Sequence, residues 1–269
     1  MTAIHCFFSG GRDSAVACYI AYQVARRRGW IYKLVYIDTT VAIKQTREYV
    51  KRYAEWLGVE LIIIRPKKTF EEYAVQHAMW PSLQPPKFRW CYFQLKLNPT
   101  INYLKENYKE GDIAVLGIKG TDSGFRQKRY TSVFFVRDYG RLKVRAWAPL
   151  LYADNYAVER LIKRFGIPRN QIWHTVGFSG ECLCLAGAPL HEIAIILRDF
   201  PEERELLLNV DRIIQRNRKS KRPAAPPSVH QAGFSTLEEF YEKAVKLQTT
   251  LDEFIMPYTG KACQGSCML

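Results

Sequence analysis

A glycine-rich segment near the amino terminus carries the strongest chemical signal in the sequence. Residues 8–14 read Phe-Ser-Gly-Gly-Arg-Asp-Ser and directly follow a short apolar run. Two adjacent glycines allow a sharp turn with outward-pointing amide groups, and a helix that begins here adds the positive end of its dipole. Such a turn binds phosphate groups. We therefore predict a phosphate or pyrophosphate site formed by Ser9, Gly10, Gly11, Arg12, Asp13 and Ser14.

The spacing of this segment narrows its chemistry. It is neither Gly-x-x-x-x-Gly-Lys-Ser/Thr, which excludes a Walker-type kinase loop, nor Gly-x-Gly-x-x-Gly, which disfavours a dinucleotide-dependent dehydrogenase. Asp13 lies in the first turn of the expected helix and is a candidate ligand for Mg²⁺ as well. The plain alternative is a strand-to-helix turn capped by serine and aspartate, and the position after the first strand favours phosphate binding over it.

Seven cysteines form the second signal. Cys6 and Cys18 fall in a predicted strand and a predicted helix, and we expect them to be small, buried, reduced residues. The first residues lack a basic segment followed by an apolar one, so we expect a cytoplasmic protein with thiols in a reducing environment. The remaining five suggest metal or redox chemistry. They are Cys91, Cys182, Cys184, Cys263 and Cys267.

Several roles remain open for these five thiols. Cys182 and Cys184 are one residue apart in a glycine-flanked loop, so an extended backbone places both sulfur atoms on one side. Four thiolates drawn from the set, with Cys91, Cys263 and Cys267 as the other members, would hold a [4Fe–4S] cluster, our first choice, or a zinc ion. Alternatively, Cys182 or Cys184 is a catalytic nucleophile that takes up sulfur, with the terminal cysteines resolving it. The plain alternative is a set of unligated thiols.

The elements that must position these groups alternate along the first half of the chain. Apolar and β-branched runs predict strands over residues 4–9, 33–37, 59–65, 112–118 and 144–147. Helical periodicity predicts helices over 13–28, 46–57, 70–77 and 155–165. This rhythm predicts an α/β, Rossmann-like fold: a parallel five-stranded sheet with helices on both faces. Ligands of such sheets bind at the carboxyl ends of the strands.

The pattern changes near residue 177. A glycine- and cysteine-rich loop precedes predicted helices over 190–218 and 236–254, and a basic, proline-rich stretch over 218–227 separates them. We therefore expect a nucleotide-binding domain over residues 1–176 and a mostly helical, cysteine-containing region over 177–269.

The charge balance bears on the partners. The chain has 40 Lys and Arg against 26 Asp and Glu, a formal net charge of +14, which attracts nucleotides and nucleic acids. A basic surface kept for solubility explains the charge equally well. A basic run over residues 212–222 keeps RNA open as a partner, although a solvated helix end is the simpler interpretation. No apolar run approaches the roughly 20 residues of a membrane helix, so we expect no membrane association.

A family resemblance rests on the residues above. Ser9-Gly10-Gly11-x-Asp13-Ser14 resembles the PP-loop of the adenine-nucleotide alpha-hydrolase superfamily. Within that superfamily, the chain resembles the phosphoadenosine phosphosulfate (PAPS) reductase family over about residues 3–200. The further segments that carry the resemblance are 36–39, 117–126, 147–150 and 166–171.

The resemblance implies ligands and roles. An adenine nucleotide (PAPS, adenosine phosphosulfate or ATP) would occupy the first loop, with Asp38 near the adenosine. Lys119 and Arg126 would contact phosphate or sulfate oxygens. Cys91 matches the point where family members with an iron–sulfur cluster carry a Cys-Cys pair.

Three hypotheses follow for the function. The first is a PAPS reductase-like oxidoreductase that reduces a sulfonucleotide to sulfite through a cysteine, with a thiol reductant protein as partner. The second is an ATP-dependent sulfurtransferase that adenylates and thiolates a nucleic acid of the tRNA type. The third is a nucleotide-binding or cluster-bearing component of a complex without turnover. A homodimer is compatible with each of them.

Overall fold

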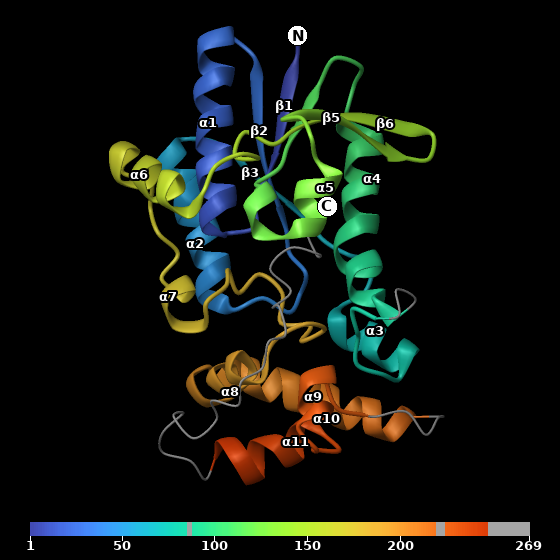
Figure 1. The fold of residues 1–269 in the computed structure, drawn as a ribbon. Helices are drawn as coiled ribbons and strands as arrows, with labels where there is room; N and C mark the ends of the chain where they lie inside the picture. Colours follow the sequence, from blue (N-terminus) through green and yellow to red (C-terminus); the bar gives the residue numbers. More distant parts are fainter. Residues whose placement is uncertain (85–87, 219–223, 247–269) are drawn as a thin grey trace.

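The computed structural model describes residues 1–84, 88–218 and 224–246. Its centre is a six-stranded sheet with the strand order β3-β2-β1-β4-β6-β5 (Figure 1). The strands are β1 (Ala3–Phe7), β2 (Ile31–Ile37), β3 (Leu61–Ile64), β4 (Ile113–Val115), β5 (Phe134–Tyr139) and β6 (Leu142–Trp147). All neighbouring pairs are parallel except β5 and β6. The predicted α/β class with helices on both faces is therefore confirmed.

The predicted strand number is wrong by one. β5 pairs antiparallel with β6, with Phe134 opposite Trp147 and Tyr139 opposite Leu142. Gly140, with φ of 75°, makes the turn between them. β5 lies at the sheet edge, where its side chains alternate between exposed and partly buried, so it lacks the buried apolar run that identified the central strands.

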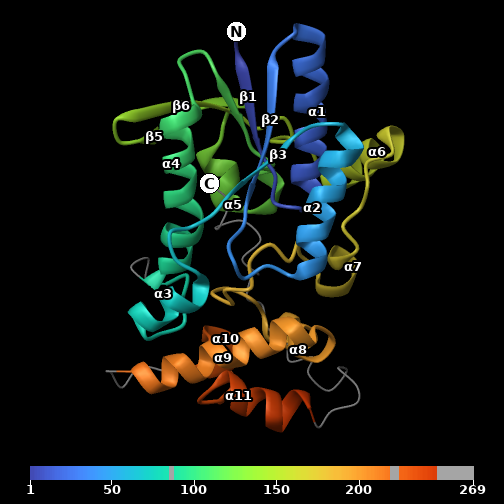
Figure 2. The same ribbon diagram turned by 180° about the vertical axis from the view of Figure 1, so that it is seen from behind.

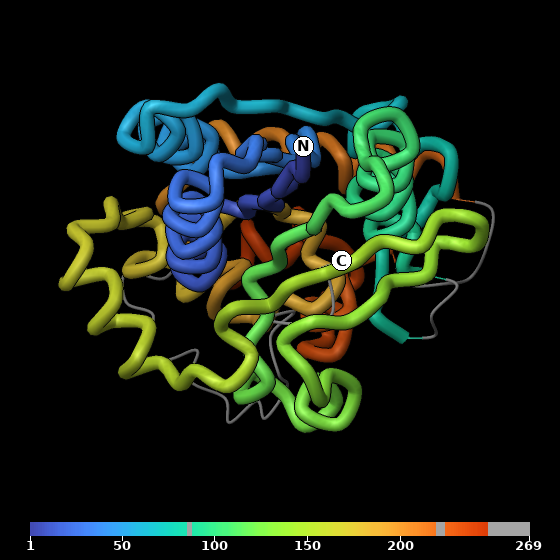
Figure 3. The backbone as a smooth tube through the Cα atoms, turned by 90° about the horizontal axis from the view of Figure 1, so that it is seen from above, coloured from blue at the N-terminus to red at the C-terminus, as the bar shows by residue number. Residues whose placement is uncertain are grey.

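Helices lie on both faces of the sheet (Figure 3), and alternate residues of the central strands belong to two separate cores. Ile4, Cys6 and Leu34 belong to a core shared with the helices α1 (Arg12–Arg28), α2 (Lys44–Leu57) and α6 (Asn155–Phe165). Phe7 and Val35 belong to the opposite core, which includes Tyr103 and Leu104 of α4 (Asn98–Asn107). This two-faced burial is the physical reason why the strands read as continuous apolar runs.

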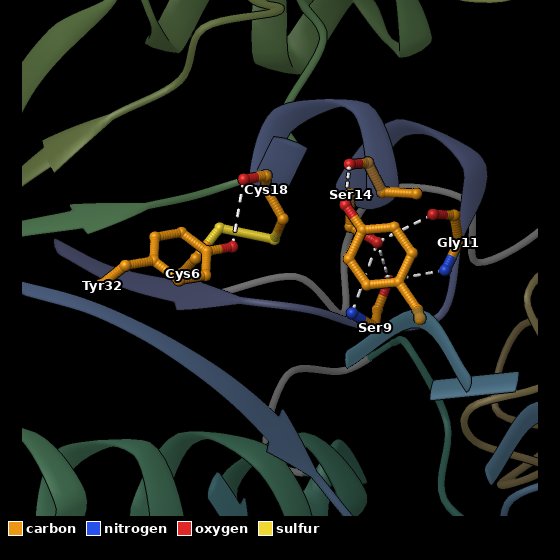
Figure 4. The surroundings of a disulfide bond; sticks show 8 residues. Cys6, Ser9, Gly11, Ser14, Cys18 and Tyr32 are labelled. Atoms are coloured by element: carbon orange, nitrogen blue, oxygen red, sulfur yellow. Dashed lines mark hydrogen bonds between the residues drawn. A yellow bond between two sulfur atoms is a disulfide. The ribbon is translucent and has the colours of Figure 1, made fainter. Parts of the chain in front are cut away.

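Cys6 and Cys18 are joined in a disulfide that links β1 to α1 (Figure 4). The expectation that both are reduced thiols is therefore wrong. The pleat of β1 points Cys6 toward α1, and α1 crosses the strand so that the two Cα atoms lie 5.7 Å apart, a separation that a disulfide spans. Both residues are fully buried, as the sequence predicted.

The described helices that follow residue 189 pack below the carboxyl ends of the central strands (Figures 1 and 2). The predicted helix over 190–218 is two helices, because Pro201 lacks an amide hydrogen and begins a new helix. The helix predicted over 236–254 is a short α-helix followed by a π-helical turn that ends at Val245, and residues 247–269 lie outside the described residues. The described α-helices that follow α6 are α7 (Ile172–Val176), α8 (Leu190–Asp199), α9 (Pro201–Asn217), α10 (Pro227–Gln231) and α11 (Leu237–Phe240).

A third core joins these helices to the middle of the chain. Ile193 of α8 and Leu207 of α9 share it with Phe70, Trp90 and Leu95. Phe70 opens α3 (Phe70–His77), whose predicted bounds are confirmed, and Leu95 lies in a π-helical segment, Tyr92–Leu97. The domain boundary at residues 176 and 177 stays a prediction. None of the described helices has the length and apolar character that crossing a bilayer requires.

Candidate functional site

The turn between β1 and α1 has the shape that its glycines predict. Gly10 adopts a φ of 74°, and a Cβ atom there would lie 2.9 Å from Cγ2 of Thr46. Gly11 is the N-cap of α1, so the amide groups of the first helical turn lack partners within the helix. The loop therefore needs glycine at position 10 both for its backbone and for its packing against α2.

Two serine hydroxyls hold this turn in place (Figure 4). The Ser14 hydroxyl donates to the Gly11 carbonyl at 2.9 Å, and the Ser9 hydroxyl accepts from the Gly11 amide at 3.3 Å. The two hydroxyls also lie 2.9 Å from each other. The serines thus hold the loop in shape, and no side chain caps the start of α1 at its N-cap residue.

Lys119, which follows β4, lies directly beside the loop. Its side chain is 1% exposed, and its ammonium group lies 3.2 Å from carboxylate oxygens of both Asp13 and Asp122. It also donates to the side-chain oxygen of Asn155, at the start of α6. A buried cation is therefore held at the mouth of the phosphate loop by three oxygen ligands.

Arg12 is held from the other side. Its Nη2 atom donates to Asn155 at 2.6 Å, its Nε atom donates to Asp13 at 3.2 Å, and its guanidinium carbon lies 5.0 Å from the centre of the Trp173 ring. Asn155 therefore accepts from both cations and sets the distance between them.

Arg126 supports this cluster from behind. Its Nη1 atom donates to Asp122 at 2.6 Å, and its side chain is 3% exposed. Burial lowers the pKa of Arg126 from its ordinary value. Through Asp122, Arg126 acts on the position of Lys119 rather than facing the cavity itself.

The cysteine loop, residues 177–189 between α7 and α8, is attached to the segment after β2 by backbone hydrogen bonds. The Leu183 amide donates to the Val41 carbonyl at 2.7 Å, and the Ile43 amide donates to the Gly180 carbonyl at 2.8 Å. Glu181, directly before Cys182, forms an ion pair with the largely buried Lys96. These contacts fix the backbone on both sides of Cys182.

Asn170 ties the two loops to each other. Its side-chain amide nitrogen lies 3.0 Å from the carbonyl oxygen of Gly10 and 3.1 Å from that of Ser179, and it donates to both. Thr46 adds a bond of 2.6 Å from its hydroxyl to the Ser179 carbonyl. The phosphate loop and the beginning of the cysteine loop therefore share one buried polar contact.

A cavity of about 230 Å³ opens between these loops. Seven of the residues predicted for the site line it: Gly11, Arg12, Asp13, Ser14, Lys119, Cys182 and Cys184. Ser9 and Gly10 lie in the same turn, behind this lining. The structure therefore brings the predicted phosphate loop and the predicted cysteine pair to one space.

Asp38 lies apart from this cavity. Its side chain is largely buried, accepts from the Thr40 amide at 3.1 Å and pairs with Arg65 at 3.0 Å. Thr40 has a φ of 65°, a conformation that costs a threonine about 1 kcal/mol and that the Asp38 bond helps to hold. Contact between Asp38 and an adenosine stays a prediction.

The described residues contain no group of three or more His, Cys, Asp or Glu side chains placed to hold a metal ion. Cys91 lies in the third core beside Trp90, away from the cavity lining, and Cys263 and Cys267 lie outside the described residues. The two oxygens of Asp13 face Arg12 and Lys119 rather than an open Mg²⁺ position. The described residues alone thus do not fit a cluster, zinc or Mg²⁺, and no reaction step is assigned to such a group.

Several residues of the site were not predicted from the sequence. Asn155 carried a weak signal, since Asp154 is a recognisable N-cap and helix starts often face ligands. The others have no motif of their own, are buried or half-buried, and line the cavity or tie its loops: Lys96, Asn170, Trp173, Glu181 and Glu192.

Comparison with known proteins gives a match to a protein-family model. The model of the phosphoadenosine phosphosulfate reductase domain matches residues 3–179. Two uncharacterized proteins of Methanocaldococcus jannaschii are similar in sequence. One is 33% identical over 105 residues, which are 39% of this chain and 23% of that protein. The other is 24% identical over 207 residues, which are 76% of this chain and 40% of that protein. The chain thus spans less than half the length of either relative.

Solved structures of low sequence identity also resemble the chain. A PAPS reductase from Candida auris in a phosphate complex is 20% identical, with a TM-score of 0.48 over 64% of this chain and 76% of that one. An NH₃-dependent NAD synthetase from Campylobacter jejuni is 14% identical, with a TM-score of 0.41 over 80% of this chain and 85% of that one.

Proposed function

Because this chain belongs to the phosphoadenosine phosphosulfate reductase domain family, we propose that it binds a sulfonucleotide in the phosphate loop and reduces it to sulfite through a cysteine. The observation that carries the proposal is the shared cavity. Gly11 to Ser14 and the two thiols of Cys182 and Cys184 line the same space, so a nucleotide phosphate held by the loop would present its sulfate toward the thiols.

The loop and its cations supply the binding energy for this substrate. The first amides of α1 point their hydrogens at a bound phosphate, and the helix dipole adds to the attraction. An entering phosphate competes with Asp13 and Asp122 for the Lys119 ammonium group. Binding therefore replaces carboxylate oxygens by phosphate oxygens around a cation that is already in place.

The reaction needs one thiolate in the cavity and two thiol groups from outside. The thiolate of Cys182 or Cys184 attacks the sulfur of the sulfate group, and the bond from that sulfur to the bridging oxygen breaks. The nucleotide phosphate leaves with the electron pair, and the loop amides and Lys119 stabilise its charge. A reductant thiolate then attacks the cysteine sulfur of the thiosulfonate, forms a disulfide with it and releases sulfite, and a second reductant thiolate resolves that disulfide and restores the cysteine thiolate.

The test is incubation of the full chain with ³⁵S-labelled PAPS and adenosine phosphosulfate in the presence of a dithiol. We expect labelled sulfite. One of the substitutions Cys182→Ser and Cys184→Ser, the one that removes the attacking thiol, should abolish its release. The exposed substitution Lys143→Met serves as the control and should leave the rate unchanged. No sulfite from either nucleotide, with both shown to bind, contradicts the proposal.

A second function is favoured by the charge of the chain. A net charge of +14 suits a polynucleotide partner, and an ATP-dependent sulfurtransferase would use the same loop to adenylate an RNA base. Formation of AMP and pyrophosphate from ATP, together with thiolated RNA, would establish this activity in place of sulfite release.

The cysteines also carry a proposal about metal. A cluster or zinc site here would need Cys263 and Cys267 beside the cysteines of the cavity. Metal analysis of anaerobically purified protein distinguishes the cases, since a [4Fe–4S] cluster gives about four irons per chain with equal sulfide. A metal-free protein favours the redox role of Cys182 and Cys184.

A further inference from the structure

Glu192 is a buried carboxyl group on the cavity wall. It lies in the first turn of α8, its residue is 6% exposed, and it lines the cavity together with Cys182 and Cys184. The proposed reduction gives it no role. The helices α8 and α9 lie beneath the cysteine loop (Figure 1), and Glu192 is the residue of α8 that lines the cavity.

The other carboxylates of the cavity are all paired with cations. Asp13 and Asp122 pair with Lys119, and Glu181 pairs with Lys96. Glu192 alone among the described lining carboxylates forms neither an ion pair nor a hydrogen bond with a described residue. Its burial raises its pKa to about 7. A carboxyl buried without a donor is costly, so this group has the properties of one half of a binding contact.

The surroundings of Glu192 differ from those of the phosphate loop. The lining near it in sequence is apolar and small, and includes Leu185, Ala186 and Ala188, with Phe178 on the preceding segment. The lining therefore divides into two sets of residues, which we call the two ends of the cavity: the loop amides with their cations, and an apolar set with one carboxyl group. The two cysteines contribute to the same lining.

We propose that this second end binds the reductant, and that the reductant is a small aminothiol whose ammonium group pairs with Glu192. This inference rests on the proposed function and names its second substrate. The reductant must reach a cysteine of the cavity, and the free carboxyl selects a cation. Because the chain as a whole carries +14, a generic charge effect would favour an anionic thiol instead.

The chemistry uses two molecules of aminothiol for each sulfite. The first thiolate attacks the cysteine sulfur of the thiosulfonate, breaks the sulfur–sulfur bond and releases sulfite with its electron pair. The second thiolate attacks the mixed disulfide, restores the cysteine thiolate and leaves as the oxidised disulfide of the aminothiol. Two thiols are oxidised, and sulfur(VI) is reduced to sulfur(IV).

Thiol–disulfide exchange tests the subsite without sulfonucleotide. The full chain is treated with cystamine, with bis(2-hydroxyethyl) disulfide and with dithiodiglycolate, which are cationic, neutral and anionic, and adducts at Cys182 and Cys184 are timed by peptide mass spectrometry. We expect cystamine to react about tenfold faster than the neutral reagent, the effect of one charge-assisted contact of about 1.4 kcal/mol.

Two variants complete this experiment. Glu192→Gln keeps the shape of the side chain and should remove the preference for cystamine, whereas Glu205→Gln, at an exposed position of α9, should retain it. The inference is overturned by an equal charge preference in Glu192→Gln and the unmodified chain. It is also overturned if no reagent reaches either cysteine, since a reductant would then have no access.

Sulfite release separates this inference from the proposed function. With cysteamine, 2-mercaptoethanol and mercaptoacetate as reductants, the cationic thiol should again be preferred, and Glu192→Gln should remove that preference. A charge preference in exchange without any sulfite release means that the subsite exists but the proposed reaction is wrong. Sulfite release without a charge preference means that the reaction is right and the subsite is wrong.

Discussion

The two ends of the cavity are built in different ways. The phosphate end is local: its glycine turn, its serines and the first turn of α1 all lie within residues 8–14, and the cations beside them are paired. The cysteine end is assembled at a distance, from backbone bonds to the segment after β2 and from α8. The first end is closely tied by hydrogen bonds and ion pairs, whereas the carboxyl group of the second has neither with a described residue.

The strongest test of the phosphate end is Gly117→Ala. A Cβ atom there would lie 2.7 Å from the Cα atom of Ser14, so either α1 or β4 must move. We expect a loss of about 3 kcal/mol in the free energy of unfolding and weaker nucleotide binding. Gly124→Ala is the matched control, because a Cβ atom at Gly124 meets nothing within 4 Å. Equal effects of the two changes in urea unfolding would mean that this end is not tightly packed.

The variant Lys119→Met tests whether the ion-paired ammonium group of Lys119 contributes to nucleotide binding. Methionine fills similar volume but leaves Asp13 and Asp122 without their shared cation, and a bound phosphate loses its buried partner. The dissociation constant of the nucleotide should rise about sixtyfold, equivalent to about 2.5 kcal/mol. Isothermal titration with PAPS and ATP measures it, and Lys143→Met should bind like the unmodified chain. Unaltered affinity in Lys119→Met would place the phosphate elsewhere.

Glu192→Gln probes the other end through pH. The folded-state pKa of about 7 lies above the value of about 4.5 in the unfolded chain, so folding favours the protonated form. The stability associated with that proton is complete below about pH 4.5 and is lost as the pH rises through 7. As the pH rises from 5 to 8, the free energy of unfolding of Glu192→Gln should therefore increase by about 2 kcal/mol relative to that of the unmodified chain. Urea unfolding at both pH values measures the gain, and a constant difference would contradict the burial of an unpaired carboxyl.

The smallest expected effect concerns the contact between the two ends. Asn170→Ala removes the donor that bridges the Gly10 and Ser179 carbonyls, and should cost about 1.5 kcal/mol of unfolding free energy. Asn209→Ala, an exposed change in α9, should cost less than 0.5 kcal/mol, about the limit for surface substitutions. Thermal unfolding compares them. If the two variants unfold alike, the loops are positioned independently.

The same contrast explains what could be predicted from the sequence. The turn at Gly10 and the helix over residues 155–165 follow from local rules of glycine conformation, capping and periodicity, and the structure has both. Within the site, the cavity lining includes residues 11–14 of the predicted loop, Lys119 and the cysteine pair.

The remaining features depend on contacts between distant parts of the chain. Strand β5 exists because β6 offers it an edge, and the Cys6–Cys18 disulfide exists because α1 crosses β1. The pairing of Asp38 with Arg65, and the lack of a partner for Glu192 among the described residues, are decided by the packing of whole elements. A local pattern gives no access to such contacts, because each partner is an ordinary residue in its own segment.

The disulfide has a practical consequence for the loop that it encloses. Cys6 and Cys18 lie on either side of residues 8–14, so a single proteolytic cut in that loop leaves both fragments covalently attached. A nicked chain would run at full length on a non-reducing gel and lose its short amino-terminal piece only after a reductant is added. Cleavage at the phosphate loop would consequently go unnoticed in any preparation that is checked without reduction.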